Sequence, residues 1–169
     1  TFKTPNLLSG IAPPAGHSYI YPKECPLDLE CYHDFYQAVE VAKKFNKPIL
    51  VDFTGYGCVN CRRMEDLVWS KPGVFELIKN EYVLVSLYTD DKKSLEKSYI
   101  STFDGREMKT VGNKWADFEA IHFNRNSQPF YVLISPDGKL LNKPVAYTPD
   151  VDEYKKFLQC GVDQFKKTN

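Results

Sequence analysis

The sequence predicts an α/β domain in which helices flank a mixed central sheet. Three observations lead to this prediction: a helix–strand–helix–strand order over residues 34–89, a strand and hairpin signal over residues 129–141, and an amphipathic helix after Pro149. Two strands joined by a helical crossover run parallel, whereas a hairpin adds antiparallel strands. With 169 residues, 43% of them hydrophobic, the chain is long enough to bury one substantial core.

The predicted domain begins near Asp34 and covers residues 34–169. Residues 1–33 contain five prolines and no sustained hydrophobic period, so we expect an extended arm or linker there. Asp34 is suited to cap a helix that Asn46-Lys47-Pro48 ends. The apolar residues that recur along this helix at helical spacing are Phe35, Ala38, Val39, Ala42 and Phe45.

Two buried strands are expected next, at Ile49–Thr54 and Tyr82–Thr89. The crossover between them should hold a helix that starts at about Cys58, and Pro72 favours a second helical start that runs to about Lys79. The apolar face of the first crossover helix is expected to carry Cys61, Met64 and Val68.

The last part of the chain combines an insertion, a hairpin and a helix. Residues 90–127 are polar and mixed, and we interpret them as an insertion with a short helix at Asn113–Phe123. An apolar strand is expected at Phe130–Ile134, and Asp137-Gly138 predicts a hairpin turn that returns through residues 139–141. The final helix is expected to bury Val151, Tyr154, Phe157 and Leu158.

Cys58-Val59-Asn60-Cys61 is a C-x-x-C pair between the first strand and its crossover helix. Cys58 would lie where the chain enters the helix, close to unpaired backbone N–H groups and the positive end of the helix dipole, which both favour a thiolate. Arg62 and Arg63 add positive potential. Cys61, one turn into the helix, should be more buried and better placed to resolve a mixed disulfide than to begin one.

Asp52 is a candidate partner for this pair. On the first strand it shares a face with Leu50 and Thr54, so its carboxyl group is expected among apolar neighbours. Burial without a cationic partner would raise its pKa and make it a proton acceptor for Cys61. The alternative is an acid that is hydrogen-bonded to a loop or exposed at the end of the strand.

Two further chemistries stay open for the C-x-x-C pair. One is a zinc site that draws its other ligands from Cys25, Cys31 or His33, and the other is a structural disulfide without turnover. Covalent haem is disfavoured because Arg62 stands where C-x-x-C-H needs histidine. Redox exchange is the favoured interpretation of the pair, so no metal site is expected.

The remaining cysteines allow a second pair. Cys25 and Cys31 are expected as a possible structural disulfide that pins the N-terminal arm, with a second redox centre as the alternative. Cys160, on the last helix, is expected to be a free thiol.

The segment Lys47–Glu65, KPILVDFTGYGCVNCRRME, resembles the active-site segment of the thioredoxin superfamily. More narrowly, it is similar to the C-terminal periplasmic thioredoxin-like domain of the DsbD thiol:disulfide interchange proteins of Bacteroides-type bacteria. Two further stretches, YVLVSLYTDD from Tyr82 and QPFYVL from Gln128, support the resemblance, which covers about residues 34–165. It implies a thioredoxin-like fold with residues 90–127 as an addition to the minimal fold.

The resemblance also implies roles for individual residues. Cys58 attacks, Cys61 resolves, and Asp52 is the buried acid. A cis Gln128–Pro129 bond is implied beside the active site, where it exposes backbone that a partner's extended chain can pair with. The residues expected to contact the substrate are Tyr56, Gly57, Val59, Asn60, Gln128 and Pro129.

The chain departs from typical thioredoxins around the two cysteines. Gly57 stands where thioredoxins have tryptophan, and Val59-Asn60 replaces Gly-Pro, while Tyr56 supplies part of the missing aromatic cover. Residues between the cysteines influence the relative stability of thiol and disulfide, so the direction of electron flow is open. An oxidase, an isomerase and a non-catalytic thioredoxin-fold binding module are the alternatives to a reductase.

The expected function is that of a protein-disulfide reductase that relays electrons through Cys58 and Cys61 without a dissociable cofactor. The resemblance implies disulfide-bearing partner proteins, a membrane-embedded electron-donor domain of the same protein, and a periplasmic location as a soluble domain of a larger inner-membrane protein. Cytochrome c biogenesis and cell redox homeostasis are the processes implied. Twenty-two basic and twenty-two acidic residues balance, and no apolar run approaches the roughly 20 residues of a membrane span. We therefore expect neither a nucleic-acid partner nor membrane insertion. We also expect a monomer.

Overall fold

The central feature of the computed structural model, which describes residues 25–168, is a mixed sheet with the strand order β1-β3-β2-β6. Its strands are β1 (Cys31–Tyr32), β2 (Ile49–Thr54), β3 (Val83–Tyr88) and β6 (Phe130–Ile134). β2 runs parallel to β3 and antiparallel to β6, as the sequence predicts. β1 adds a short parallel strand beside β3. Residues 1–24 of the expected arm lie outside the described residues.

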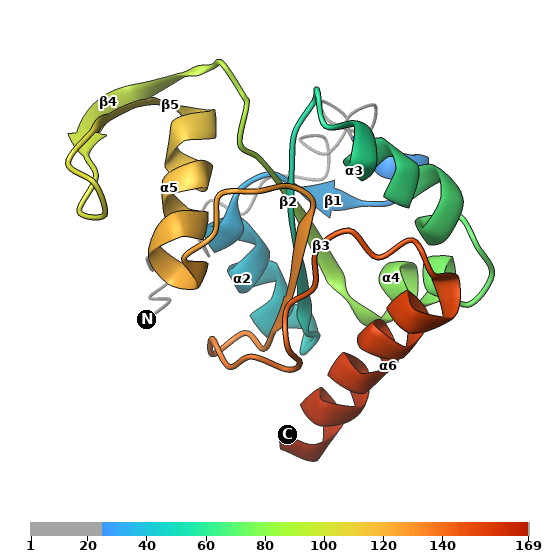
Figure 1. Cartoon of the computed structure of the whole chain (residues 1–169). Helices are drawn as coiled ribbons and strands as arrows, with labels where there is room; N and C mark the ends of the chain where they lie inside the picture. Colours follow the sequence, from blue (N-terminus) through green and yellow to red (C-terminus); the bar gives the residue numbers. More distant parts are fainter. Residues whose placement is uncertain (1–24, 169) are drawn as a thin grey trace.

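Helices cover both faces of this sheet, as Figure 1 shows. One face carries α2 (Phe35–Phe45) and α5 (Val111–Phe123). The other carries α3 (Val59–Met64), the π-helical turn η4 (Glu65–Trp69), α4 (Val74–Glu81) and α6 (Val151–Thr168). Among residues 25–168, no helix combines the length and apolar character that a membrane span requires.

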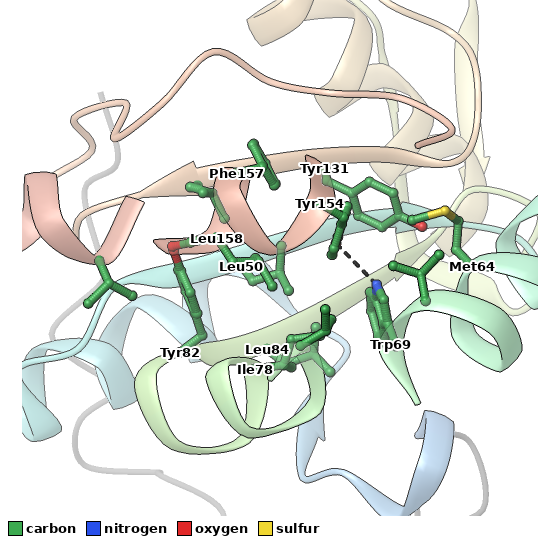
Figure 2. Close-up of a cluster of buried hydrophobic side chains, with 14 of the residues drawn as sticks. Leu50, Met64, Trp69, Ile78, Tyr82, Leu84, Tyr131, Tyr154, Phe157 and Leu158 are labelled. Carbon is green, nitrogen blue, oxygen red and sulfur yellow. Dashed lines mark hydrogen bonds between the residues drawn. The ribbon is translucent and has the colours of Figure 1, made fainter. Parts of the chain in front are cut away.

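The alternation of β2 divides the hydrophobic core into two clusters. Ile49, Val51 and Phe53 pack under α2 and α5, whereas Leu50 faces α4 and α6. Figure 2 shows the second cluster, in which the indole N–H of Trp69 donates to the Tyr154 hydroxyl over 3.1 Å. Because every β2 side chain is buried, a polar residue on this strand must find its partners inside the protein.

α2 forms as the sequence predicts. The Asp34 carboxylate accepts from the backbone N–H groups of Tyr36 and Gln37, and Asn46 ends the helix in the left-handed conformation. Phe45, however, is 60% exposed. Although Phe45 continues the apolar spacing of the helix, it lies outside the core, and its ring is 5.7 Å from the Lys44 ammonium nitrogen.

The predicted hairpin after β6 forms, with less pairing than a full strand. The chain turns at Asp137-Gly138 and returns antiparallel to β6, where the Leu141 backbone N–H donates to the Leu133 carbonyl over 2.9 Å. The pairing is limited to isolated bridges at Leu140 and Val145. Pro144, which has no backbone N–H to donate to a ladder, lies between these two bridges.

The insertion holds more regular structure than the sequence predicts. β4 (Ser94–Ile100) and β5 (Glu107–Thr110) form a separate antiparallel pair. Thr110 caps α5, which begins at Val111, two residues before the expected start. Nearly every β4 side chain is exposed, so the strand lacks the alternation by which strands are recognised.

Part of the segment assigned to the arm packs on the domain. The 3-10 turn η3 (Pro26–Asp28) leads into β1, and Leu29 is buried in the hydrophobic cluster that faces α4 and α6.

Candidate functional site

Cys58 and Cys61 lie at the junction of β2 and α3 and are joined by a disulfide. Cys58 is the N-cap of α3, and its Sγ accepts a hydrogen bond from the Cys61 backbone N–H over 3.2 Å. Cys58 is partly exposed, whereas Cys61 is 1% exposed. One sulfur-bearing side chain is therefore accessible at the start of a helix, and its partner is sealed beneath it.

Asp90 holds the loop that leads to Cys58, and the sequence analysis did not identify it. Its carboxylate accepts from the backbone N–H of Tyr56 over 2.9 Å and from that of Gly57 over 3.0 Å. A side chain at Gly55 would place its Cβ 3.1 Å from the same carboxylate. Its position in the sequence could have indicated this role, because Asp90 follows β3, the strand parallel to β2, and parallel strands end at one edge of a sheet.

Asp90→Ala is expected to loosen this loop. Losing two charge-assisted hydrogen bonds should speed amide hydrogen exchange at Tyr56 and Gly57 by roughly tenfold or more, since each such bond contributes about 1–2 kcal/mol. Asp91→Ala removes a neighbouring carboxylate that accepts from Lys93 instead, so it should leave these two amides unchanged. Equal protection in the Asp90 variant and the wild type would show that the carboxylate does not hold the loop.

The surface around Cys58 is apolar and aromatic. The Tyr56 ring stacks on the ring of Tyr88, with 4.0 Å between centroids and 19° between planes. Tyr56 is 49% exposed and Val59 is 64% exposed, while Gly57 is exposed and Asn60 is partly so. These four residues, which the sequence analysis assigns to substrate contact, therefore form an accessible surface at the C-x-x-C pair.

Gln128 and Pro129 lie at the same edge of the sheet. Phe130 pairs antiparallel with Phe53, so the residues before β6 approach the end of β2, where the Cys58 loop begins. The Gln128–Pro129 peptide bond is cis, as the resemblance implies. The Gln128 side chain is partly buried and its amide donates to Glu119 Oε1 over 3.0 Å.

Glu119 is a buried acid behind this loop, and the sequence analysis did not identify it. Its side chain is 0% exposed, and its Oε2 has no hydrogen-bond partner among the described residues. Burial raises the pKa of Glu119 to about 7, although the hydrogen bonds from Gln128 and Ser127 act in the opposite direction. Glu119 belongs to α5, so no local pattern connects it to the loop that it supports.

Glu119→Gln is expected to change the pH dependence of stability. The folded protein holds a proton on this carboxyl between about pH 4.5 and 7 that the unfolded chain releases, so wild-type stability falls as pH rises through that window. The free energy of unfolding of the variant minus that of the wild type should be about 1–3 kcal/mol larger at pH 8 than at pH 4. Urea unfolding at both pH values checks this, with the exposed Glu153→Gln as the matched control. Parallel profiles for Glu119→Gln and wild type would contradict the prediction.

Asp52 is the buried acid of the site. It is 2% exposed and accepts from the Ser86 hydroxyl over 3.1 Å, so it is neither exposed nor hydrogen-bonded to a loop. Burial, with the nearby charge of Glu65, raises the pKa of Asp52 to about 8, against smaller opposing effects of Ser86 and Arg62. Near neutral pH this carboxyl can therefore both hold and accept a proton.

Arg62 is paired rather than a simple source of positive potential. Its guanidinium donates to Glu65 Oε2 over 2.9 Å and to Thr54 Oγ1 over 3.0 Å. Burial raises the pKa of Glu65 to about 6, with Arg62 opposing the shift. The pair links α3 to the end of β2 on the side where Asp52 is buried.

Two of the other three cysteines form a separate group with His33. Cys25 and Cys31 are joined by a disulfide, and Cys160 is an exposed free thiol on α6. The ligand atoms of Cys25, Cys31 and His33 lie within 4.8 Å of one another. This group contains neither Cys58 nor Cys61, so within residues 25–168 the zinc site that would combine the two sets has no geometric support.

The sequence profile of the thioredoxin-like domain family matches residues 35–160 of the chain. No curated protein sequence matches the chain. Among solved structures, a thioredoxin from Thermus thermophilus is 19% identical with a TM-score of 0.55, and the alignment covers 76% of this chain and 84% of that one. The C-terminal domain of DsbD from Neisseria meningitidis, in its reduced form, is 13% identical with a TM-score of 0.51, over 72% of this chain and 88% of that one.

At these identities the two structural likenesses concern the fold alone. The family profile carries the assignment further, because it extends from α2 into α6 and so spans Asp52, the Cys58–Cys61 disulfide and the cis-proline loop. The chain belongs to the thioredoxin-like domain family.

Proposed function

We propose that the protein is a thiol:disulfide oxidoreductase that reduces disulfides of partner proteins through Cys58 and Cys61. One observation carries the proposal: the Cys58–Cys61 disulfide at the start of α3 has an accessible sulfur-bearing side chain, a buried one, and a buried acid of raised pKa nearby on β2. A structural clamp does not need a buried acid whose proton is labile near neutral pH.

The reaction begins with attack. In the reduced protein the Cys58 thiolate attacks one sulfur of the partner's disulfide, the new S–S bond forms, and the partner's second sulfur leaves as a thiolate. The start of α3 favours the Cys58 thiolate, because its Sγ accepts the Cys61 N–H and lies at the positive end of the helix.

Resolution completes the exchange. The Asp52 carboxylate accepts the Cys61 proton, directly or through water, and the Cys61 thiolate then attacks Cys58 Sγ. The mixed disulfide breaks, and the partner sulfur that was bonded to Cys58 leaves as a thiolate. The enzyme keeps the Cys58–Cys61 bond. Two electrons have passed from the enzyme to the partner.

The electron donor is proposed to be a membrane-embedded domain of the same protein, which restores the Cys58–Cys61 dithiol in the periplasm. The resemblance of Lys47–Glu65 to the DsbD interchange proteins supports this, and an N-terminal arm would serve as the tether. No dissociable cofactor enters the cycle, since thiols and disulfides carry both electrons.

The reduction potential of the Cys58–Cys61 pair tests the direction of transfer. Equilibration with glutathione buffers in a Cys160→Ser background, with each pair quantified by alkylation and peptide mass, should give a value well below about −200 mV. A value near about −120 mV would make the protein an oxidant. A pair that does not exchange with added thiols at all would support a non-catalytic binding module.

A further inference from the structure

The second disulfide, Cys25–Cys31, closes a short loop at the edge of the sheet. Within that loop Leu27 and Asp28 have φ angles of 57° and 58°, in the left-handed region that residues other than glycine rarely occupy. Cys25 is buried, whereas Cys31 is partly exposed on β1. The pair therefore repeats the asymmetry of Cys58 and Cys61, with one accessible and one covered sulfur-bearing residue.

A histidine faces the more accessible of the two residues. His33 Nε2 lies 3.8 Å from Cys31 Sγ, and His33 Nδ1 lies 3.2 Å from the Ser86 carbonyl oxygen. A carbonyl oxygen can only accept, so Nδ1 carries the proton of that hydrogen bond. The ring is thereby held with Nε2 directed at the sulfur, which is the arrangement that stabilises a thiolate beside an imidazolium.

This group also lies next to the active site. Ser86, whose carbonyl holds His33, donates its hydroxyl to Asp52 and pairs with Asp52 in the β2–β3 register. The His33 ring also contacts Tyr88, 5.6 Å between centroids, and Tyr88 stacks on Tyr56. β1 occupies the sheet edge beside β3, as Figure 1 shows, and Cys31 packs on the same core cluster as Met64 and Trp69.

We propose that Cys25–Cys31 is a second redox-active disulfide, in which Cys31 exchanges with external thiols and Cys25 resolves. A structural staple needs no oriented imidazole at its sulfur. The chemical class of its redox partner is a dithiol.

Electrons and protons balance in the reductive direction. A thiolate of the dithiol attacks Cys31 Sγ, the Cys25–Cys31 bond breaks, and Cys25 leaves as a thiolate that takes up a proton. The second thiol of the dithiol loses its proton and attacks its own sulfur in the mixed disulfide, which releases Cys31 as a thiolate and leaves the dithiol oxidised. The proton that the attacking thiol of the dithiol loses on becoming a thiolate can pass to His33 Nε2, and the resulting ion pair with the Cys31 thiolate favours the reduced state.

A glutathione titration tests this proposal separately from the proposed function. The wild-type protein is equilibrated in a series from oxidised to reduced glutathione, quenched by alkylation, and digested, so that each pair is read from its own peptides. The Cys25–Cys31 pair is expected to pass from disulfide to dithiol within the series. The proposal is overturned if this pair stays oxidised throughout the glutathione series, whatever the Cys58–Cys61 pair does.

His33→Phe keeps an aromatic ring against Tyr88 and removes both nitrogens. In a Cys58→Ser, Cys61→Ser background, it should shift the Cys25–Cys31 equilibrium about tenfold toward the disulfide and slow alkylation of reduced Cys31 about tenfold at pH 7, with Cys160 as the internal reference. His122→Phe, which removes an imidazole from α5, should change neither value.

The readouts separate a redox role from a structural one. A lower melting temperature in the His33 variant, with an unchanged equilibrium and an unchanged Cys31 alkylation rate, would mean that the histidine only supports the fold. One tightly bound zinc per chain in the reduced protein would instead make Cys25, Cys31 and His33 a metal site. Either result overturns the proposal.

Discussion

Cys61→Ser protein, reduced and mixed with a disulfide-bearing partner, is expected to accumulate a mixed disulfide through Cys58, whereas Cys58→Ser protein accumulates none. The reason is the order of the two steps: Cys58 is accessible at the start of α3, and Cys61 is 1% exposed beneath it. Both variants should lose turnover by at least roughly 1000-fold, because removing either member of a cooperating catalytic group stops the cycle. Non-reducing electrophoresis and a turnover assay measure both effects.

Cys160→Ser is the matched control for these variants. Cys160 is an exposed free thiol on α6, so this substitution should leave turnover and the trapped species unchanged. Normal rates in both active-site variants would remove the proposed mechanism. A mixed disulfide trapped by the Cys58 variant in place of the Cys61 variant would reverse the assigned roles.

Asp52→Asn is expected to slow the resolving step by roughly 100-fold at neutral pH, the typical contribution of a positioned proton acceptor. With a pKa of about 8, Asp52 is ionised in about 10% of molecules at pH 7, and this fraction rises as pH rises. The wild-type rate of partner release should therefore increase through pH 8, and the variant should lack this component. Stopped-flow measurement of release from a preformed mixed disulfide separates resolution from attack.

The same substitution should stabilise the oxidised protein. Because the pKa of Asp52 is raised from 3.8 to about 8, the folded state keeps a proton that the unfolded chain releases between these pH values, and wild-type stability falls as pH rises through the window. Asparagine does not ionise, so the stability difference in favour of the variant should grow by a few kcal/mol between pH 4 and pH 8. A variant that is both slower and more stable would identify Asp52 as a buried charge kept for function.

Asp152→Asn, an exposed substitution in the first turn of α6, is the control for both measurements and should change neither. Unchanged resolution in the Asp52 variant would remove its role as proton acceptor. Unchanged pH dependence of unfolding would show that the carboxyl is not protonated in the folded state.

The parts of the site that the sequence analysis predicted depend on short spacing. The C-x-x-C pair, the Asp34 cap and the buried position of Asp52 each follow from residues within one or two turns or one strand. Their environments are set by local periodicity, which a single sequence displays directly. The cis Gln128–Pro129 bond, by contrast, was predicted from the family resemblance and not from any local pattern.

The parts that it missed depend on contacts between distant segments or on exposed strands. Asp90 reaches the Tyr56 and Gly57 amides across 34 and 33 residues, and this contact exists because β2 and β3 end together. Glu119 meets Gln128 because α5 packs beside the start of β6. The β4–β5 pair was missed because both faces of β4 are exposed, so hydrophobicity does not alternate along it.

By itself the sequence determined the α/β class, the parallel β2–β3 crossover, and a C-x-x-C cysteine pair at the start of a helix with an acid on the preceding strand. Only the tertiary structure decided that Asp90 anchors the Cys58 loop, that a buried Glu119 supports the cis-proline loop, and that His33 orients its ring toward the Cys25–Cys31 disulfide. The physical reason is one of range. Periodicity and helix capping act within a few residues, whereas a buried carboxyl or an oriented imidazole is defined by groups that only the packed sheet and its register bring within hydrogen-bond distance.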